Sequence, residues 1–148
     1  MSDAVDCRVT PEPLDTGALL RGVADSSDGA VLLFVGVVRQ QNEGRAVTHL
    51  EYEAYAPMAE AKLREICREA RERWRTGRVC AVHRVGRLEI GEASVAIAVA
   101  APHRGDAYEA SRYVIEELKR RVPVWKREGY VDGPSEWLAG VTPGGEPG

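Results

Sequence analysis

The sequence predicts an α+β fold, with two long helices packed against a mostly antiparallel sheet. Apolar residues recur at helical spacing in two long segments, 57–74 and 105–121. Several other segments alternate between apolar and polar residues, or are apolar throughout, over the length of a strand. At 148 residues the chain is most simply one domain with its own core. We therefore expect a single domain over residues 1–140, followed by a disordered Pro- and Gly-rich tail over 141–148.

The first part of the chain predicts a strand, a short helix and a second strand. Residues 7–9 form the first strand, and residues 14–24 form a short helix that Asp15 or Thr16 can cap. The run 30–38 is apolar on both faces. Because strands that are buried on both faces lie inside a sheet, we expect this run to be a central strand.

The middle of the chain predicts a polar loop, a half-exposed strand and a long helix. Residues 39–45 are polar and end the apolar run. Residues 47–55 alternate, which predicts a strand with one face toward solvent. Pro57 suits the first turn of a helix, and the apolar face of this helix continues to Trp74. Gly77 is expected to end the helix.

The last part predicts further strands, the second long helix and an extended end. Residues 79–85 alternate, which predicts a strand with one apolar face. Residues 88–101 form one strand or a bent pair of strands around Gly91. The helix covers 105–121 and is ended by a proline, after which residues 124–126 are extended.

Composition and charge exclude several classes of protein. The formal net charge is −3, whereas nucleic-acid binding normally needs a basic face, so we expect no nucleic-acid partner. The apolar run 30–38 is far shorter than a membrane span. The three cysteines form no Cys-x-x-Cys pair and have no histidine at metal-ligand spacing, so we expect no disulfide framework, metal or cofactor. The N-terminus lacks the features of a signal peptide, and we expect a cytoplasmic protein.

Lys119 is the first candidate catalytic residue. Helix phase places Tyr108, Ser111, Ile115 and Leu118 on the inward face, and Lys119 lies at the border of that face. A lysine that lies against apolar surface and near other cations loses its proton more easily, and it can then act as a nucleophile or proton carrier. The alternative, which spacing alone favours, is a lysine whose stem simply runs along the helix edge.

Further candidate cations lie before and after this helix. His103 and Arg104 stand where a strand meets the helix, a position that suits a phosphate. A histidine capping the loop and an arginine paired with Glu109 explain them equally well. Lys126 follows the helix and Arg39 ends the apolar run, and local sequence favours solvent-exposed roles for both. The sequence leaves open whether these residues meet in one anion site.

A series of motifs occurs along the chain in a specific order. They are Phe34-Val-Gly-Val-Val-Arg39, Leu50-Glu-Tyr-Glu-Ala-Tyr55 with Pro57-Met58, Val82-His-Arg-Val-Gly-Arg-Leu88, His103-Arg104 with Ala107-Tyr-Glu-Ala110, and Leu118-Lys119 with Pro123-Val-Trp-Lys-Arg-Glu128. In this order the motifs resemble the large subunit of molybdopterin synthase, from about Gly29 to Trp137. The His-Arg and Pro-x-Trp-Lys-x-Glu elements are the most specific of them.

The resemblance implies a fold, a reaction and partners. Its fold is the molybdopterin synthase large-subunit fold, of the α/β-hammerhead type. That family converts cyclic pyranopterin monophosphate to molybdopterin in molybdenum cofactor biosynthesis by installing two dithiolene sulfurs. The sulfur arrives as a thiocarboxylate on the C-terminal glycine of a small ubiquitin-like carrier subunit. The large subunits form a homodimer with one carrier at each end, which makes a heterotetramer.

The resemblance also implies roles for individual residues. Lys119 would be the principal catalytic lysine, beside the carrier's terminal glycine, and Lys126 would be the second. The implied substrate-binding residues are Val37, Val38, Arg39, His103, Arg104, Lys119, Lys126, Arg127 and Glu128. After Trp137 the chain departs from the family, because a Pro/Gly tail stands where relatives often carry a charged helix that can reach the neighbouring subunit's site.

A second class of function remains as the alternative. A non-catalytic homologue would bind a ubiquitin-like carrier or a phosphorylated ligand without performing chemistry. A binding module of this kind has no need of both lysines, so Lys119 and Lys126 together favour the sulfur-transferring enzyme.

Overall fold

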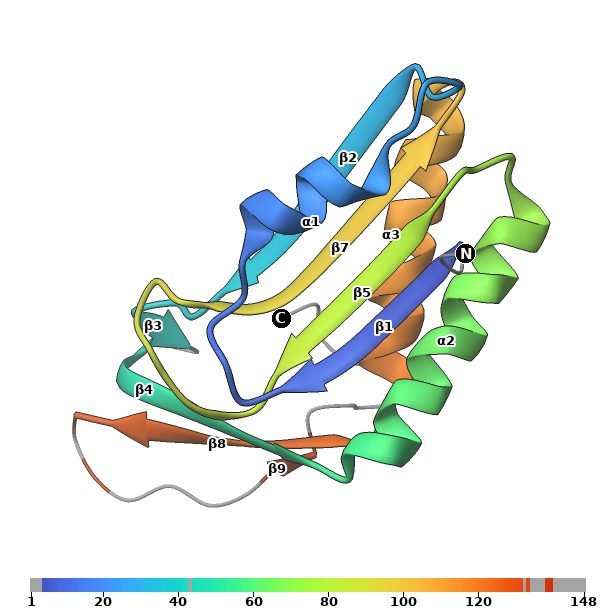
Figure 1. The fold of residues 1–148 in the computed structure, drawn as a ribbon. Coiled ribbons are helices and arrows are strands. Elements are labelled where there is room, and N and C mark those ends of the chain that lie inside the picture. The colour runs from blue at the N-terminus through green and yellow to red at the C-terminus, as the bar shows by residue number, and fades with distance from the viewer. Residues whose placement is uncertain (1–3, 43, 132, 134–137, 140–148) are drawn as a thin grey trace.

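Two β-sheets and three helices make up the part of the chain that a computed structural model describes, residues 4–42, 44–131, 133 and 138–139 (Figure 1). The tail predicted over 141–148 lies outside the described residues. The predicted α+β class is confirmed, with most strand pairs antiparallel. None of the described helices is long and apolar enough to cross a membrane.

The first sheet has four strands in the order β1-β5-β7-β2. These are β1 (Val5–Thr10), β5 (Val79–Arg84), β7 (Ala93–Ala101) and β2 (Ala30–Val37). β1 and β5 are parallel, and the other neighbours are antiparallel. β5 and β7 are buried along almost their whole length, so they are the central strands of this sheet.

The prediction of a central strand over residues 30–38 is wrong. β2 lies at the edge of the first sheet, and β7 is its one strand partner among the described residues. β2 is apolar on both sides because helices pack on both faces of the sheet at this edge. Residues 79–85 alternate in sequence, but the strand they form, β5, has no solvent-exposed face. It is a central strand and is covered on both sides.

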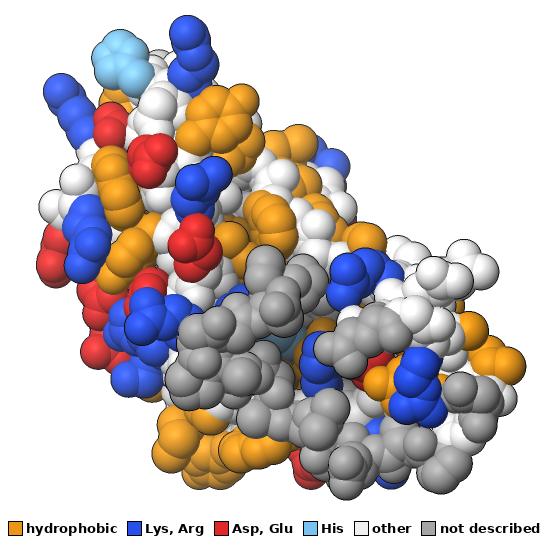
Figure 2. All heavy atoms as spheres, turned by 180° about the vertical axis from the view of Figure 1, so that it is seen from behind, with side chains coloured by type: hydrophobic (Ala, Val, Ile, Leu, Met, Phe, Trp, Pro, Cys, Tyr) orange, Lys and Arg blue, Asp and Glu red, His pale blue; other side chains and the backbone are white. Residues whose placement is uncertain are grey.

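The helices cover the first sheet unequally (Figure 1). α2 (Ala56–Arg73) and α3 (Arg104–Arg121) pack side by side on one face, and the short α1 (Thr16–Val23) lies on the other. α1 begins as predicted, because Asp15 Oδ1 accepts a hydrogen bond from the Ala18 N–H at 3.0 Å. Figure 2 shows the α2–α3 side, where basic and acidic side chains alternate around a few apolar ones.

The main core lies between this helix pair and the first sheet. Leu63 and Ile66 of α2 and Val114 of α3 are fully buried against Ile97 and Val99 of β7. Burying a side chain of this kind contributes about 1.5–3 kcal/mol relative to leaving it in water. The core therefore fixes the position of both helices on the sheet.

Two details of the predicted helices are wrong. α2 ends at Arg73, before Gly77, because Trp74 already has extended backbone. Tyr108 is 59% exposed and does not belong to the inward face of α3. That face consists of Ala107, Ala110, Ser111, Val114 and Leu118, whose small members let the helix approach the sheet closely.

The second sheet is formed by strands from distant parts of the chain. Its strands are β3 (Gln41–Asn42), β4 (Arg45–Ala54), β6 (Gly86–Glu89), β8 (Val124–Tyr130) and β9 (Leu138–Ala139), all antiparallel. β4 pairs with β3, β6 and β8. This sheet lies across one end of the first sheet (Figure 1).

The strands of the two sheets also settle four sequence predictions. The half-exposed strand over 47–55 is confirmed as β4. The polar loop over 39–45 contains the short β3, and the extended end over 124–126 is the start of a longer β8. Residues 88–101 form a pair of strands, as one of the two alternatives predicted, with Gly91 at φ 87° in the turn between β6 and β7.

The last turn of α3 is tied to α2 by a group of ion pairs. Arg121 donates from both terminal nitrogens to the two Glu69 oxygens, at 2.7 and 2.9 Å. The Tyr113 hydroxyl donates to Glu69 Oε1 at 2.6 Å, and Arg121 also bonds to Glu117 at 3.2 Å. The hydrogen bonds from Arg121 and then Tyr113 lower the pKa of Glu69 to about 2.

We predict that Glu69→Gln destabilises the protein by about 1–2 kcal/mol at pH 7, because a partly exposed bidentate pair is lost. The folded-state pKa of Glu69 is lowered, so its contribution is full above the ordinary carboxyl pKa and is lost as the pH falls toward about 2. Urea unfolding at pH 7 and at steps below pH 4.5 measures this difference. Glu116→Gln, which removes an exposed pair with Arg112 at 3.9 Å, is the control and should cost less than about 0.5 kcal/mol. Equal losses for the two variants would contradict the prediction.

Candidate active site

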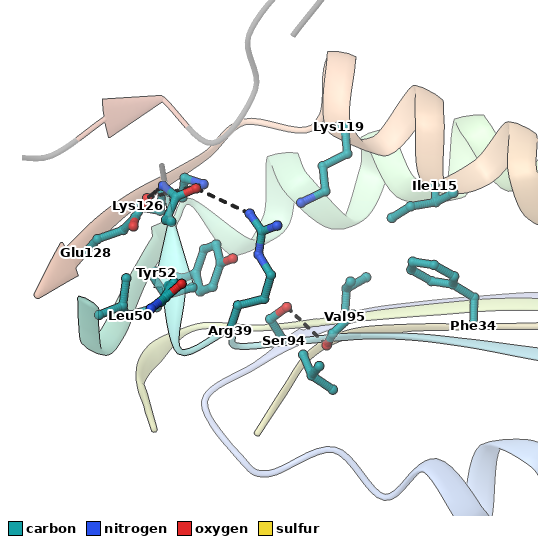
Figure 3. A pocket seen from close by; sticks show the side chains of 15 residues that line it. Phe34, Arg39, Leu50, Tyr52, Ser94, Val95, Ile115, Lys119, Lys126 and Glu128 are labelled. Carbon is teal, nitrogen blue, oxygen red and sulfur yellow. Dashed lines mark hydrogen bonds and ion pairs between the residues drawn. The ribbon is translucent and has the colours of Figure 1, made fainter. Parts of the chain in front are cut away.

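A pocket opens between the two sheets, beneath the last turns of α3 (Figure 3). Five parts of the chain supply its polar side chains: the segment after β2, strands β4, β7 and β8, and the helix α3. Its lining residues are Phe34, Gly36, Val37, Arg39, Gln41, Asn42, Val47, Leu50, Tyr52, Ser94, Val95, Ile115, Lys119, Lys126 and Glu128. The pocket thus brings together five of the predicted site residues, which come from three distant parts of the sequence: Val37, Arg39, Lys119, Lys126 and Glu128.

Lys119 reaches into the pocket from α3, as its place at the border of the apolar face predicts (Figure 3). Its neighbour Arg120 is exposed. Burial lowers the pKa of the Lys119 amine, and the charges of Lys126 and Arg39 lower it further. No described carboxylate lies within ion-pair distance of Lys119, so nothing in this part of the chain opposes the loss of its proton. The amine is therefore prepared for proton transfer or nucleophilic attack.

Lys126 lies in a different electrostatic environment. Its Nζ is 3.8 Å from Oε1 of Glu128, a carboxylate that is only 4% exposed. The Asn42 amide also donates to Glu128 Oε1, at 2.7 Å. The two lysines therefore differ in their surroundings: a carboxylate lies beside Lys126, whereas burial and neighbouring cations surround Lys119 and lower its pKa.

Glu128 itself has unused hydrogen-bonding capacity. Its Oε2 is buried and has no hydrogen-bond partner among the described residues. A buried carboxylate oxygen is normally bonded, so this atom is a natural acceptor for a donor that enters with a ligand.

Arg39 lies opposite Lys119, just beyond the end of β2 (Figure 3). Its Nη2 donates to Asn42 Oδ1 at 3.3 Å, so Asn42 links Arg39 to Glu128. The guanidinium keeps further donors for a phosphate, which it can bind in a bidentate manner. The turn after β2 therefore supplies the third cation of the pocket.

The resemblance also implies substrate contacts for Val37, Val38 and Arg127, of which only Val37 lines the pocket. Val37 lines the pocket and is exposed. Val38 is buried, and its backbone N–H and C=O pair with residues 92 and 91. Arg127 lies on the other face of β8 from Lys126 and donates to Glu51 at 2.8 Å. Substrate contacts of these residues stay predictions.

His103 and Arg104 do not join the pocket within one chain. They stand at the start of α3, both exposed, whereas Lys119 lies 15 residues further along the helix. At 1.5 Å per residue this separation is about 22 Å. The pair with Glu109 that would explain Arg104 locally is not formed among the described residues. Their phosphate-binding role stays a prediction that one copy of the chain cannot fulfil.

Sequence reasoning did not select several residues of the pocket. Asn42 belongs to a segment that the sequence predicts only as a polar loop. Tyr52 and Ser94 belong to strands whose alternation indicates the face on which a side chain lies but not the residues it meets there. Phe34 and Ile115 form an apolar end of the pocket (Figure 3). Only the pairing of β4 with β8 and the crossing of α3 bring these side chains together.

The three lysines of the chain allow a direct test of this site. We predict that the Lys119 amine titrates at lower pH than Lys62, an exposed lysine paired with Glu65 at 2.8 Å. Removing the charge by Lys126→Met should raise the Lys119 pKa. NMR of reductively ¹³C-methylated protein, with each lysine assigned by substitution, measures all three. Titration of Lys119 at or above the pH of Lys62 would refute the described environment.

Fold and pocket define the class of protein: an α+β protein with a pocket between two sheets that Arg39, Lys119 and Lys126 line. Residues 9–121 match the family model described as "MoaE protein". The chain therefore belongs to the MoaE family, and the family resemblance found in its sequence is confirmed.

Relatives of known name and structure agree with this assignment. The chain is 46% identical over 125 residues to the "Molybdopterin synthase catalytic subunit" of Halalkalibacterium halodurans, covering 84% of this chain and 80% of that protein. It is 43% identical over 130 residues to the protein of the same name from Bacillus subtilis, covering 88% and 82%. A crystal structure of molybdopterin synthase from Staphylococcus aureus matches with a TM-score of 0.84 and 44% identity, over 89% of this chain and 96% of that one.

Proposed function

We propose that this chain is the catalytic large subunit of a molybdopterin synthase. It transfers sulfur from the C-terminal thiocarboxylate of a small ubiquitin-like carrier to cyclic pyranopterin monophosphate. The observation that carries the proposal is the amine of Lys119, which burial and the two cations Lys126 and Arg39 surround and which no described carboxylate approaches within ion-pair distance. Such a set can bind a phosphorylated substrate and supplies an amine whose lowered pKa makes it a better proton acceptor than an exposed lysine.

The chemistry exchanges sulfur for oxygen without a change of oxidation state. The thiocarboxylate sulfur forms a bond to a substrate carbon, the carbon–oxygen bond there breaks, and the oxygen takes up a proton and leaves as water. Water then adds to the carrier's acyl carbon, the acyl–sulfur bond breaks, and the sulfur stays on the substrate while the carrier leaves as a carboxylate. Lys119 takes the proton from the attacking water and returns it to the leaving sulfur. A second carrier repeats the sequence for the second sulfur.

The shape of the pocket suits an extended chain end. Phe34 and Ile115 line its apolar side and lead to the Lys119 amine (Figure 3). A chain that ends in glycine carries no side chain to clash in such a channel. A solved complex described as subunits 1 and 2 of molybdopterin-converting factor from Helicobacter pylori shares this fold, with a TM-score of 0.70 at 20% identity. We propose that the small carrier subunit inserts its C-terminus here.

We further propose that two copies of the chain pair along the edge strand β2. The opposite edge of the sheet, β1, is protected: α2 packs beside it and Glu60 accepts a hydrogen bond from the Val9 N–H at 2.8 Å. β2 reads Ala-Val-Leu-Leu-Phe-Val-Gly-Val, with no charge and no proline to discourage pairing. A long apolar edge of this kind is a template for another strand.

Antiparallel pairing of two β2 strands would also complete the site. The start of β2 lies beside the end of β7, since Ala30 pairs with Ala101 and His103 follows two residues later. The end of β2 leads to Arg39. About a two-fold axis, the start of one strand lies next to the end of the other. His103 and Arg104 of a second copy would then stand near Arg39 and add to its phosphate site.

We predict that Lys119→Ala lowers the rate of dithiolene formation by at least about 100-fold, because proton transfer is lost. Purified protein, a thiocarboxylated carrier and cyclic pyranopterin monophosphate make up the assay. Carrier affinity should change little, since the amine is one small part of that contact. Lys62→Ala, an exposed lysine outside the pocket, is the control and should keep the wild-type rate. Absence of product with the wild-type protein would instead favour the non-catalytic homologue.

We predict that inactive variants complement each other if the site is shared. Lys119→Ala and Arg104→Ala each disable every site of their own homodimer. A mixed dimer has one site with both changes and one site with neither, so a 1:1 random mixture should recover about one quarter of wild-type activity. Mixing of purified variants after reversible dissociation, followed by the same assay, measures the recovery. No recovery, with mixed dimers demonstrated by mass, would contradict a shared site.

A further inference from the structure

Tyr52 is a buried phenol in the pocket that none of the predicted roles includes. It lies on β4 and is 9% exposed, and its side chain forms part of the pocket wall. In Figure 3 its hydroxyl points into the same part of the pocket as the Arg39 guanidinium and the Lys119 amine. A tyrosine in this place brings a hydrogen-bond donor to the reacting groups without bringing a charge.

A buried histidine holds the Tyr52 ring in place. The His83 ring stands edge-on to it, with centroids 5.0 Å apart and an interplanar angle of 76°. His83 Nδ1 lies 2.8 Å from the Arg84 carbonyl oxygen, which only accepts, so Nδ1 carries the proton. His83 is 4% exposed, and burial lowers its pKa to about 4, with the nearby charge of Lys119 lowering it as well. The imidazole is therefore neutral at pH 7 and fixed in orientation.

Tyr52 keeps its proton. Burial raises the pKa of its phenol, and the Glu128 carboxylate also raises it, although Ser94 acts in the opposite direction. Its neighbours in the pocket are engaged: Arg39 bonds to Asn42, and Lys126 lies 3.8 Å from Glu128. A further cation here would repel the others and add to the cost of desolvation. A neutral donor avoids both effects.

We propose that the Tyr52 hydroxyl donates a hydrogen bond to the acyl oxygen of the carrier's C-terminus during sulfur transfer, and that His83 is the residue that positions Tyr52. This inference rests on the proposed sulfur transfer. When water adds to the acyl carbon, the carbonyl oxygen becomes an oxyanion, which the Tyr52 hydroxyl stabilises without giving up its proton. As the acyl–sulfur bond breaks, the oxyanion becomes a carboxylate oxygen and the hydrogen bond weakens.

The direct test is Tyr52→Phe, which keeps the ring and its contact with His83 but removes the donor. The single-turnover rate of sulfur transfer should fall by about 100- to 1,000-fold, the loss typical of removing one oxyanion donor. Affinities for carrier and for substrate should stay within about twofold, because the bond strengthens only in the transition state. Tyr108→Phe, at an exposed tyrosine of α3, is the matched control and should be without effect.

The role of His83 is tested by a double-mutant cycle. His83→Leu should lower the single-turnover rate in the wild-type background but not further in the Tyr52→Phe background, because His83 acts through the Tyr52 hydroxyl. Additive losses would overturn the positioning role. The Tyr52→Phe background also detects a general structural effect of His83→Leu. Such an effect would lower the rate in both backgrounds, whereas a positioning role lowers it only where the Tyr52 hydroxyl is present.

The outcomes for Tyr52 are distinct. An unchanged rate in Tyr52→Phe, or a weakened substrate affinity with an unchanged rate, overturns the inference while leaving the proposed sulfur transfer intact. Failure of the wild-type protein to form product overturns the sulfur transfer itself, and this inference with it.

Discussion

The bidentate ion pair between Arg121 and Glu69 is the interaction on which the site depends most. It fixes the last turn of α3 against α2, at 2.7 and 2.9 Å. Residues two positions apart on a helix point about 200° away from each other. Because Arg121 faces α2, Lys119 has to face the opposite way, into the space between the two sheets (Figure 3). The apolar core under α3 sets the distance of the helix from the sheet. The Arg121–Glu69 pair sets the rotation of its last turn, which carries Lys119.

The charges of the pocket are distributed unequally, and this inequality gives the two lysines different properties. The buried carboxylate Glu128 lies beside Lys126 and is bonded to Asn42, which in turn holds Arg39. Lys119 receives only repulsion and desolvation from its surroundings. One carboxylate among several cations is therefore enough to give the two lysines different surroundings, with an acidic neighbour for Lys126 and only cationic neighbours for Lys119.

Local sequence patterns predicted the helices and strands whose buried face can be identified from the residues of that one segment. The apolar spacing of α2 and α3 is such a pattern, and helix phase was sufficient to place Lys119 at the border of a buried face. The second sheet could not be predicted, because β4 and β8 pair residues 47–54 with 124–130, and alternation gives a face but not a partner. The edge position of β2 was missed for the same reason: helices on both sides of an edge strand produce the same apolar run as a central position does. Tyr52 has no local signal, whereas the separation of His103 and Arg104 from Lys119 follows from the length of the predicted helix.

The central claim is that Lys119 works as a free amine because burial and the neighbouring cations lower its pKa. The pH dependence of the single-turnover rate of sulfur transfer tests this claim most directly. The rate should rise with pH along a limb that lies below the ordinary pKa of a lysine, about 10.4. In Lys126→Met this limb should move to higher pH, since a charge that lowers the Lys119 pKa has been removed. A limb at the ordinary lysine pKa, or one that does not move when Lys126 is replaced, would contradict the account.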